Sequence, residues 1–577
     1  MSSSPAEKKV RARPSHHFPP STEAVPTLPV DSVGEGTDKL TRSAGTVSLG
    51  VMGSRVLGLA REMVLAYFFR TSGGLDAFYA AFRIPNLLRD TFAEGALSKA
   101  FVTVFTEVGE KQDEQAGVRL ANLVTNVVLV VVGLSTLLGI YFSEAIVNLM
   151  LPGGGFDLAL PAGESFGFAS KRELTIVLTQ VMFPFLLLVS LAAVAMGFLN
   201  ARGQFFVPAL SSMFFNLGSI GVGVAGYFVA PRYGHHPTVG MAVGVLAGGA
   251  FQLLWQVPAL WRQGYRYRPI LSFRDSGLWK VIHLFGPGAL VAATVQVNVF
   301  INSIFASLGS GWMSWISQSF RLLHLPLGLV GVAVSVASLP KLSRAVARKD
   351  AAGFRETFSH AIRLVLLFTV PASVGLVVLA QPIVRLIYER GRFQPEDTTQ
   401  VAVALVFYAL GLTSYAAVKI VTDGFYALQD IRAPLMISVL SMVTNAGLNW
   451  FLIVKLGMDH RGLALSTSCT ITVSLVLLWA LLRKRSGMQR LGGWAALRMM
   501  VKMVVASALM GAVAFAASQG LDRWLGHQML VWRLAQVGLP IGLAVVVLYG
   551  ACKMLRVREM DEALRALRTR RSETEVS

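Results

Sequence analysis

The sequence has few charged residues and few cysteines for its length. Charged residues make up 15% of the 577 residues, whereas soluble domains carry about 25%. The two cysteines, Cys469 and Cys552, both lie in apolar segments, which argues against a disulfide framework or a metal site. The sequence also lacks a G-x-x-x-x-G-K-[ST] phosphate-binding motif. No His, Ser or Cys spacing is typical of a catalytic centre, so the sequence predicts a protein that is not an enzyme and needs no cofactor.

Long apolar runs follow one another along most of the chain. Hydrophobic residues make up 54% of the sequence, and its mean hydropathy is +0.58. About 20 apolar residues suffice for a helix to cross a bilayer. The sequence therefore predicts an all-α polytopic membrane protein with about fourteen transmembrane helices. We expect these helices at residues 44–69, 74–107, 118–150, 173–199, 205–229, 238–261, 281–308, 312–340, 358–388, 397–428, 433–455, 461–482, 495–517 and 529–553.

Related short motifs recur about 230 residues apart, such as Phe82-Arg83 and Phe320-Arg321. An even number of spans separates the copies, which indicates a parallel pseudo-repeat of two six-helix lobes with a site between them; chance similarity is the alternative. The expected divisions are a disordered cytoplasmic tail (1–42), an N-lobe (43–262), a basic cytoplasmic loop (263–280), a C-lobe (281–484), two final helices (485–555) and a cytoplasmic tail (556–577).

The net charge of +20 comes mostly from basic residues in loops and tails between the apolar runs. The basic loops all fall on one side of the expected membrane, after the sixth, eighth, twelfth and fourteenth spans. The positive-inside rule therefore places both termini in the cytoplasm. This pattern is not typical of a nucleic-acid-binding protein.

The stretch 74–107 is long enough to cross a bilayer but is unusually rich in charge. Asp76, Arg83 and Asp90 recur at every seventh residue, so they lie along one face of a helix. Pro85 should kink that helix. Because charges inside a membrane helix are costly unless they face water or each other, we expect this polar face to line a cavity. A solvated surface helix is the alternative.

Several arginines in apolar runs suit a phosphate-bearing anion, because guanidinium binds phosphate through two parallel hydrogen bonds. Other interpretations stay open: Arg55 and Glu62 could neutralise each other, and Arg61 and Arg89 could extend to the membrane interface. The candidate substrate-binding residues are Arg55, Arg61, Arg83, Arg89 and Arg321, and the candidate cavity-charge or gating residues are Glu62, Asp76 and Glu94.

Several motifs closely resemble those of the MurJ/MviN lipid II flippases of the multidrug/oligosaccharidyl-lipid/polysaccharide superfamily. The most specific are Ser54-Arg55-Val56-Leu57-Gly58, Arg61-Glu62, Asp76-Ala77-Phe78, Pro85-Asn86-Leu87-Leu88-Arg89 and Phe92-Ala93-Glu94-Gly95-Ala96. The resemblance covers roughly residues 44–555. It implies a fourteen-helix flippase that moves undecaprenyl-diphosphate-linked peptidoglycan precursor from the inner to the outer leaflet by alternating access. It also implies that the family's central basic positions fall on the five candidate arginines, and that the final two helices form a groove for the lipid tail.

The resemblance also implies a location and partners. We expect a multi-pass protein of the bacterial cytoplasmic (inner) membrane, with lipid II and membrane lipids as partners, acting as a monomer or with peptidoglycan synthases. Transport would be driven by the membrane potential or an ion gradient. Some members have an aspartate-containing sodium site in the second lobe, where this sequence has Asn302, Asn445 and Asn449. A cation site without formal charge should be weak.

Three other functions stay open at this point. One is a flippase for a different polyprenyl-linked glycan. Another is a cation-coupled drug exporter of the same superfamily, which would favour acidic residues in the cavity. The third is a membrane scaffold without transport.

Overall fold

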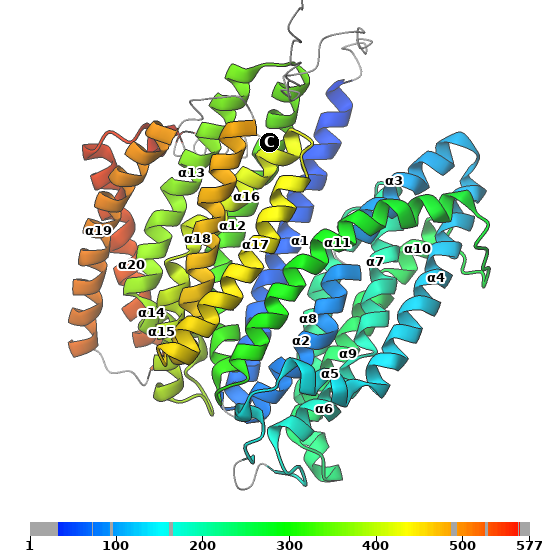
Figure 1. The fold of residues 1–577 in the computed structure, drawn as a ribbon, viewed down its shortest axis with the longest axis horizontal. Coiled ribbons are helices and arrows are strands. Elements are labelled where there is room, and N and C mark those ends of the chain that lie inside the picture. Colours follow the sequence, from blue (N-terminus) through cyan, green and yellow to red (C-terminus); the bar gives the residue numbers. More distant parts are fainter. Residues whose placement is uncertain are drawn as a thin grey trace, which may run out of the picture.

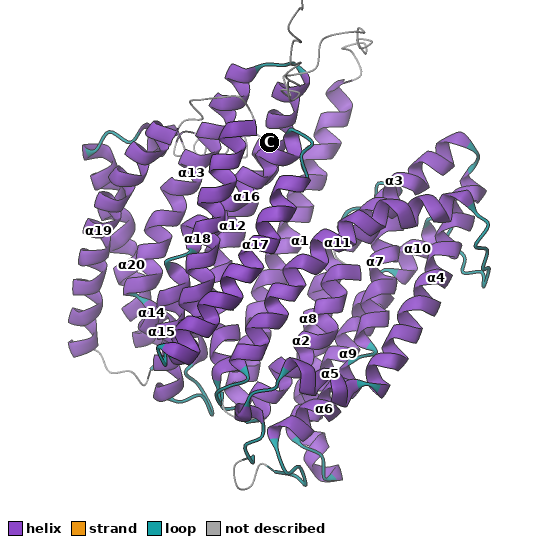
Figure 2. Ribbon diagram, in the orientation of Figure 1, coloured by secondary structure: helices purple, strands orange, loops and turns teal. Residues whose placement is uncertain are grey.

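The computed structural model describes residues 33–71, 73–92, 96–160, 165–485, 493–524, 529–562 and 565. Across these ranges the regular structure is helical, without a β-strand (Figure 2). The first helices are α1 (Val33–Phe68), α2 (Gly74–Phe92), α3 (Ala96–Lys111), α4 (Glu114–Tyr141), α5 (Ser143–Met150), η2 (Gly154–Phe156), α6 (Lys171–Met182), α7 (Phe185–Ala201), α8 (Phe206–Val229), η3 (Ala230–Tyr233), α9 (Pro237–Leu254) and α10 (Val257–Arg262). The remaining helices are α11 (Ser276–Ala306), α12 (Trp312–Ala347), α13 (Ala351–Val378), α14 (Ala380–Tyr388), α15 (Pro395–Ala409), α16 (Leu412–Ala427), α17 (Arg432–Asn449), η4 (Trp450–Lys455), α18 (Asp459–Arg485), α19 (Gly493–Trp524) and α20 (Leu530–Met554).

Ten helical segments of the described residues are long and apolar enough to cross a bilayer, or eleven if α15 and α16, which meet at 42°, form one span. The expected all-α polytopic membrane fold is therefore confirmed, whereas the expected count of fourteen spans is not. Every stretch expected to span the membrane contains a helix. Helices α1 and α2 are not among the ten, and both carry several charged side chains.

The charged stretch 74–107, expected to be a single kinked helix, is described in two parts. Helix α2 ends at Phe92 with Pro85 inside it, and α3 begins at Ala96. Residues 93–95, where the two parts would join, lie outside the described part of the chain. Helix α1 begins at Val33 and so extends into the range 1–42 that was expected to be a tail.

The helices form two groups, and the space between them widens toward the top of the view in Figure 1, the end at which the C-terminus is labelled. Helices α2–α10 lie together on one side, and α12–α18 lie on the other, with α19 and α20 at the far edge. Helix α1 packs against α8 of the first group, while α11 contacts α3 and α2 as well as α17. Helices α19 and α20 pack on each other and on α13 and α14. The site described below lies between the two groups.

Glycines bring α8 and α9 into direct backbone contact. A Cβ atom added at Gly244 of α9 would lie 2.5 Å from the Cα atom of Gly223 on α8. One added at Gly240 would overlap the backbone of Gly226. Small residues at such positions let membrane helices approach closely without an intervening layer of side chains. This pair therefore forms a tightly packed unit within the first group.

The loop after α10 is held along α4 by two asparagine side chains. Asn122 accepts a hydrogen bond from the backbone N–H of Arg268 at 2.7 Å. Asn126 donates to the carbonyl groups of Arg268 and Ile270 at 2.8 and 3.0 Å and accepts from the Tyr267 hydroxyl at 2.7 Å. These bonds satisfy backbone groups that would otherwise need water, and they fix the connection between the two groups of helices.

Candidate functional site

A cavity of about 910 Å³ lies between the two groups of helices. Residues from α1, α2, α7, α8 and α9 line one side, and residues from α11, α12 and α16 line the other. Its cationic lining residues are Arg55, Arg61, Arg83, Arg89, Arg321 and Lys419. Glu62 is the one carboxylate among the lining residues that the structure describes. The five candidate arginines therefore share one cavity, as the arrangement predicted from the sequence requires; their roles in binding stay predictions.

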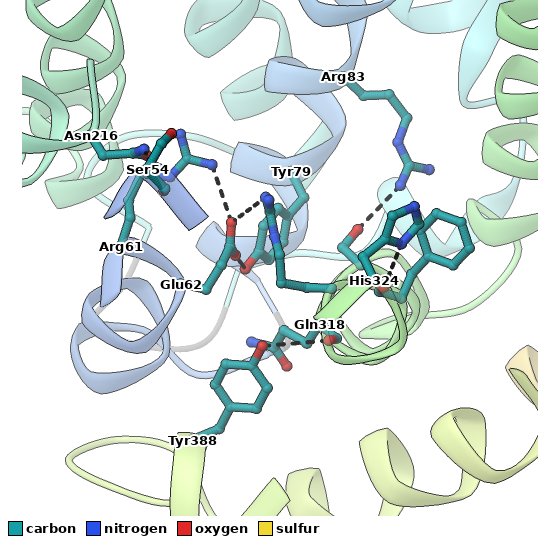
Figure 3. A network of polar contacts seen from close by, with 12 residues as sticks. Ser54, Arg61, Glu62, Tyr79, Arg83, Asn216, Gln318, His324 and Tyr388 are labelled. Atoms are coloured by element: carbon teal, nitrogen blue, oxygen red, sulfur yellow. Dashed lines mark hydrogen bonds and ion pairs between the residues drawn. The ribbon is translucent and has the colours of Figure 1, made fainter. Parts of the chain in front are cut away.

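Glu62 connects cations from both sides of this cavity (Figure 3). Its side chain on α1 is only 2% exposed. Arg61 of α1 and Arg321 of α12 both donate to its Oε1 atom, at 3.2 and 2.8 Å. The Tyr79 hydroxyl of α2 donates to its Oε2 atom. Glu62 thus pairs with Arg61 and Arg321, and not with Arg55, which the seven-residue spacing had suggested as a partner.

Arg83 points from α2 toward the second group of helices (Figure 3). Its Nη1 atom lies 3.1 Å from Ser303 Oγ on α11, and its Nη2 atom lies 3.2 Å from Ser317 Oγ on α12. Its Nη1 atom also contacts the Met313 sulfur at 3.2 Å. These partners are neutral, so the contacts satisfy its N–H groups without neutralising its charge. A cation in that state favours an anion in the adjoining cavity.

Arg61 and Arg55 are placed by different contacts. The Arg61 guanidinium carbon lies 5.4 Å from the ring centres of both Phe82 and Phe215, a geometry that attracts a cation to the aromatic faces. Arg55 lies against the backbone of α12, because a Cβ atom added at Gly328 would overlap its guanidinium group. Helix α1 therefore contributes cations at two separate levels of the cavity.

Asp76 does not line the cavity, contrary to what its place on the Arg83 face suggested. It is fully buried and accepts hydrogen bonds from the backbone N–H and hydroxyl of Ser314, at 3.0 and 2.6 Å, and from the backbone N–H of Gly311. Lys171 of α6 lies 3.4 Å away. Asp76 therefore caps the N-terminus of α12, where unpaired backbone N–H groups favour an anion. The third acidic candidate, Glu94, lies outside the described residues.

Further contacts join the two groups close to Asp76. Lys171 donates to Ser310 Oγ at 2.8 Å. The backbone N–H groups of Gly153 and Gly155 donate to the hydroxyl and carbonyl oxygens of Ser307, at 2.9 and 3.0 Å. A Cβ atom on either glycine would clash with the backbone of the facing loop. The two groups are therefore closed against each other at this end.

The three asparagines of the candidate cation site come together at α11, α17 and α18. Asn449 donates to Asn302 Oδ1 at 2.8 Å and to Asn445 Oδ1 at 2.7 Å. Ser466 donates to Asn449 Oδ1. The amide oxygens that a cation would need are thus engaged by N–H and O–H donors. The described residues contain no group of three or more His, Cys, Asp or Glu side chains placed to hold a metal ion.

The sequence interpretation missed two groups that contribute to the cavity. Lys419 of α16 is a cavity cation in a long apolar run whose nearest charged residue is Asp423, four residues later; a charge inside such a run is itself a signal. Tyr79 lies three residues after Asp76 and contacts Glu62. A buried Tyr hydroxyl needs a hydrogen-bond partner, but the sequence does not reveal which acid supplies it.

Comparisons with known proteins agree with this arrangement. The sequence model of a family described as "Lipid II flippase MurJ" matches residues 65–535. A Vibrio cholerae protein named "Probable lipid II flippase MurJ" is 34% identical over 532 residues, which cover 91% of this chain and 97% of that protein. A solved structure titled "Lipid II flippase MurJ, inward closed conformation" aligns with a TM-score of 0.70 and 25% identity over 88% of this chain and 99% of that chain. An inward-facing multidrug resistance transporter of the MATE family shares the fold at a TM-score of 0.62 and 13% identity, covering 78% of this chain and 99% of its own.

Proposed function

The chain belongs to the MurJ family of lipid II flippases, and we propose that it carries undecaprenyl-diphosphate-linked peptidoglycan precursor across the cytoplasmic membrane through the cavity between its two groups of helices. The observation that carries this proposal is the gathering of five arginines and a lysine around one carboxylate in that cavity. A sugar-diphosphate headgroup cannot cross hydrocarbon unaided, because burying its charge without partners costs too much free energy.

Three arginines of the cavity, Arg61, Arg83 and Arg321, can replace water around the diphosphate; we call them the deep arginines. Arg83 has neutral partners, so its charge is available to an anion. Arg321 and Arg61 share the single carboxylate Glu62, and a diphosphate with two or more negative charges can compete with that carboxylate for their N–H groups. Substrate binding would then weaken a bridge between α1 and α12. Glu62 is therefore suited to couple headgroup binding to movement of the two groups of helices.

Alternating access requires a closure that can open. The contacts of Asp76 with Gly311 and Ser314, and of Gly153 and Gly155 with Ser307, join the two groups at one end. They consist of a few hydrogen bonds and lie on the side opposite to the basic loops. With the termini in the cytoplasm, as the positive-inside rule indicates, this closure would face outward and the cavity would receive substrate from the inner leaflet.

Energy would come from the membrane potential. Moving an anion out of an inside-negative cell is favoured by about 2.3 kcal/mol per charge per 100 mV. The asparagine cluster offers a sodium ion no carboxylate, and its amide oxygens are engaged by donors. Sodium coupling at that cluster is therefore disfavoured.

The cavity also separates this proposal from the alternatives. A cation-coupled drug exporter would favour acidic lining residues, whereas the described part of this lining has one carboxylate and six cations. The family match to residues 65–535 disfavours a carrier of a different polyprenyl-linked glycan. Action as a monomer or together with peptidoglycan synthases, and a groove for the lipid tail at α19 and α20, belong to this proposal as well.

The test combines genetics with reconstitution. The chain should replace an essential lipid II flippase in cells, with the precursor in the outer leaflet measured directly. In vesicles, Arg83→Ala and Arg321→Ala should bind and move the diphosphate lipid roughly ten- to a hundredfold less well, since each removes a charge-assisted hydrogen-bond partner. Arg83→Lys and Arg321→Lys should recover only part, because ammonium lacks the planar fork. Normal membrane abundance with normal binding and flipping in both alanine variants would exclude the substrate role.

A further inference from the structure

The cations of the cavity lie at two depths along α12. Arg321 marks the deep level, where it pairs with Glu62 at 2.8 Å. Gly328 lies seven residues further along the helix, which is about 10 Å at 1.5 Å per residue. The Arg55 guanidinium group lies against the backbone there, since a Cβ atom added at Gly328 would overlap it. Arg55 and Arg321 therefore occupy different levels of one cavity.

Lys419 lies even further from Arg321 along α12 than Arg55 does. We call the part of the cavity that holds Arg55 and Lys419 the outer level. Helix α16 packs along α12, and a Cβ atom added at Gly331 would lie 3.6 Å from Ala416. Further along both helices, the Asp423 carboxyl group is hydrogen-bonded by the side chain of Ser335. The two helices therefore run in the same direction at this contact. Lys419 lies between those two points, beyond the level of Arg55, and lines the cavity.

Lys419 interacts with one nearby acid but forms no direct hydrogen bond with it. That acid is Asp423, one turn away on the same helix, which attracts Lys419 electrostatically but whose Oδ2 atom is buried and has no hydrogen-bond partner. The Lys419 ammonium group is thus not bonded to that oxygen. At the deep level, by contrast, Glu62 engages both Arg61 and Arg321. The outer level combines two cations, and no carboxylate accompanies them among the lining residues within the described ranges.

We propose that Arg55 and Lys419 form a second anion subsite, which binds a carboxylate of the peptide on the substrate while the deep arginines hold its diphosphate. This inference rests on the proposed function. An extended peptide advances about 3.3–3.6 Å per residue, so a stretch of about three residues spans the separation of the two levels. Carboxylate is a good match for a guanidinium fork and an ammonium group together. The outer subsite would therefore recognise the peptide, whereas the deep site recognises the lipid diphosphate.

Binding to the full-length protein in lipid nanodiscs tests this division with three probes. The first is undecaprenyl diphosphate without sugars or peptide, the second is the same lipid carrying the disaccharide and peptide, and the third carries the peptide with its carboxylates converted to methyl esters. The variants are Arg55→Gln and Lys419→Gln, and Lys455→Gln is the control. Lys455 lies in η4 over the Trp450 ring and does not line the cavity.

Each outer variant should bind the peptide-bearing lipid about tenfold less tightly and the peptide-free lipid within about twofold of wild type, because one charged hydrogen-bond partner is lost. The lipid whose peptide carboxylates are methyl esters should bind the wild-type protein weakly. Its affinity should be about that of the unesterified peptide-bearing lipid for Lys419→Gln. It should also be insensitive to either variant. Lys419→Arg should keep the preference for the peptide carboxylate, since it keeps the charge.

Equal losses for the peptide-bearing and peptide-free lipids would overturn the inference and assign the outer cations to the diphosphate. Unchanged binding of the methyl ester to wild type would overturn it without any variant, so a poorly folded Lys419→Gln protein does not prevent a decision. Failure of wild type to bind either diphosphate lipid would instead refute the proposed function, which separates the two failures.

Discussion

Replacing Asp76 by asparagine should open the closed end of the protein. Asp76 accepts three hydrogen bonds from Gly311 and Ser314 across the closure and caps the start of α12. Asparagine keeps the shape of the side chain but removes the charge, and its NH₂ group cannot accept from a backbone N–H. Charged hydrogen bonds and the helix-terminus interaction together make the loss roughly 2–3 kcal/mol in the closed state. The ion pair with Lys171 involves α2 and α6 of the same group of helices, so its loss affects open and closed states alike.

A loss of about 2–3 kcal/mol corresponds to a thirtyfold to more than hundredfold shift between two states. The shift can be measured as a distance distribution between spin labels at Leu149 on α5 and Val454 in η4, both exposed and in different groups of helices. Asp76→Asn should move much of the distribution to longer distances. Ser314→Ala, which removes only the hydroxyl donor at 2.6 Å, should move it less.

The matched control for this experiment is Asp157→Asn. Asp157 also pairs with a cation, Arg172, at 2.6 Å, but both belong to the first group of helices. Its pKa is lowered by the hydrogen bond from Arg172, so the control likewise removes a charged partner. Asp157→Asn should leave the distance distribution unchanged. An abundant, folded Asp76→Asn protein with the wild-type distribution would refute the assignment of Asp76 to the closure.

Four further outcomes are expected. A cysteine at Leu308 should react with an impermeant reagent on intact cells and one at Arg348 should not, because basic loops stay in the cytoplasm; the reverse pattern would invert the orientation. Transport in vesicles should persist when potassium replaces sodium at fixed potential, and loss of most activity would show that the asparagine cluster binds sodium. Burial first, and then Arg392, lowers the pKa of His236 to about 4, so the unfolded chain binds a proton that the folded protein does not between pH 6.5 and about 4. The free energy of unfolding should fall in that window as the pH falls, by about 1.4 kcal/mol per pH unit. A series of thermal-unfolding measurements at different pH should show a smaller fall for His236→Asn, which keeps a capping acceptor. Gly244→Ala should destabilise the protein by roughly 1–3 kcal/mol through overpacking, whereas Gly221→Ala, with open space around it, should not; equal unfolding temperatures for the two would contradict the close contact.

The sequence was sufficient to predict the class of fold and the cationic cavity because both follow from local patterns. Apolar runs of membrane length indicate spanning helices, and arginines inside such runs must face water, a partner or a cavity. Arg55, Arg83 and Arg321 accordingly line one cavity. The pairing of Glu62 was not predictable, because its partner Arg321 lies 259 residues away and the neighbouring choice of Arg55 was equally consistent with helical spacing.

Asp76 shows why a shared helix face does not imply a shared site. The seven-residue spacing from Arg83 places both on one face of α2, but it also separates them by about 10 Å along the helix. Over that distance the surroundings change from the cavity to the N-terminus of α12. Lys419 was missed for a related reason, because an aspartate four residues after a lysine resembles an ordinary surface pair on a helix.

The glycine contact between α8 and α9 limits where motion can occur. Packed helices normally slide by small side-chain rearrangements at their interface, but here backbone faces backbone at Gly223 and Gly244, so there is no such layer to rearrange. Helices α8 and α9 must therefore move together as one rigid body. Asn122 and Asn126 fasten the following loop to α4. The start of α11 also packs on the first group, since Lys280 pairs with Glu107 of α3 and Val281 belongs to the same buried cluster as residues of α3 and α4. We therefore expect the rotation to be absorbed further along α11, beyond Val281. A crosslink that stiffens α11 between Val281 and Gln296 should therefore stall the transport cycle even though it leaves the closure untouched.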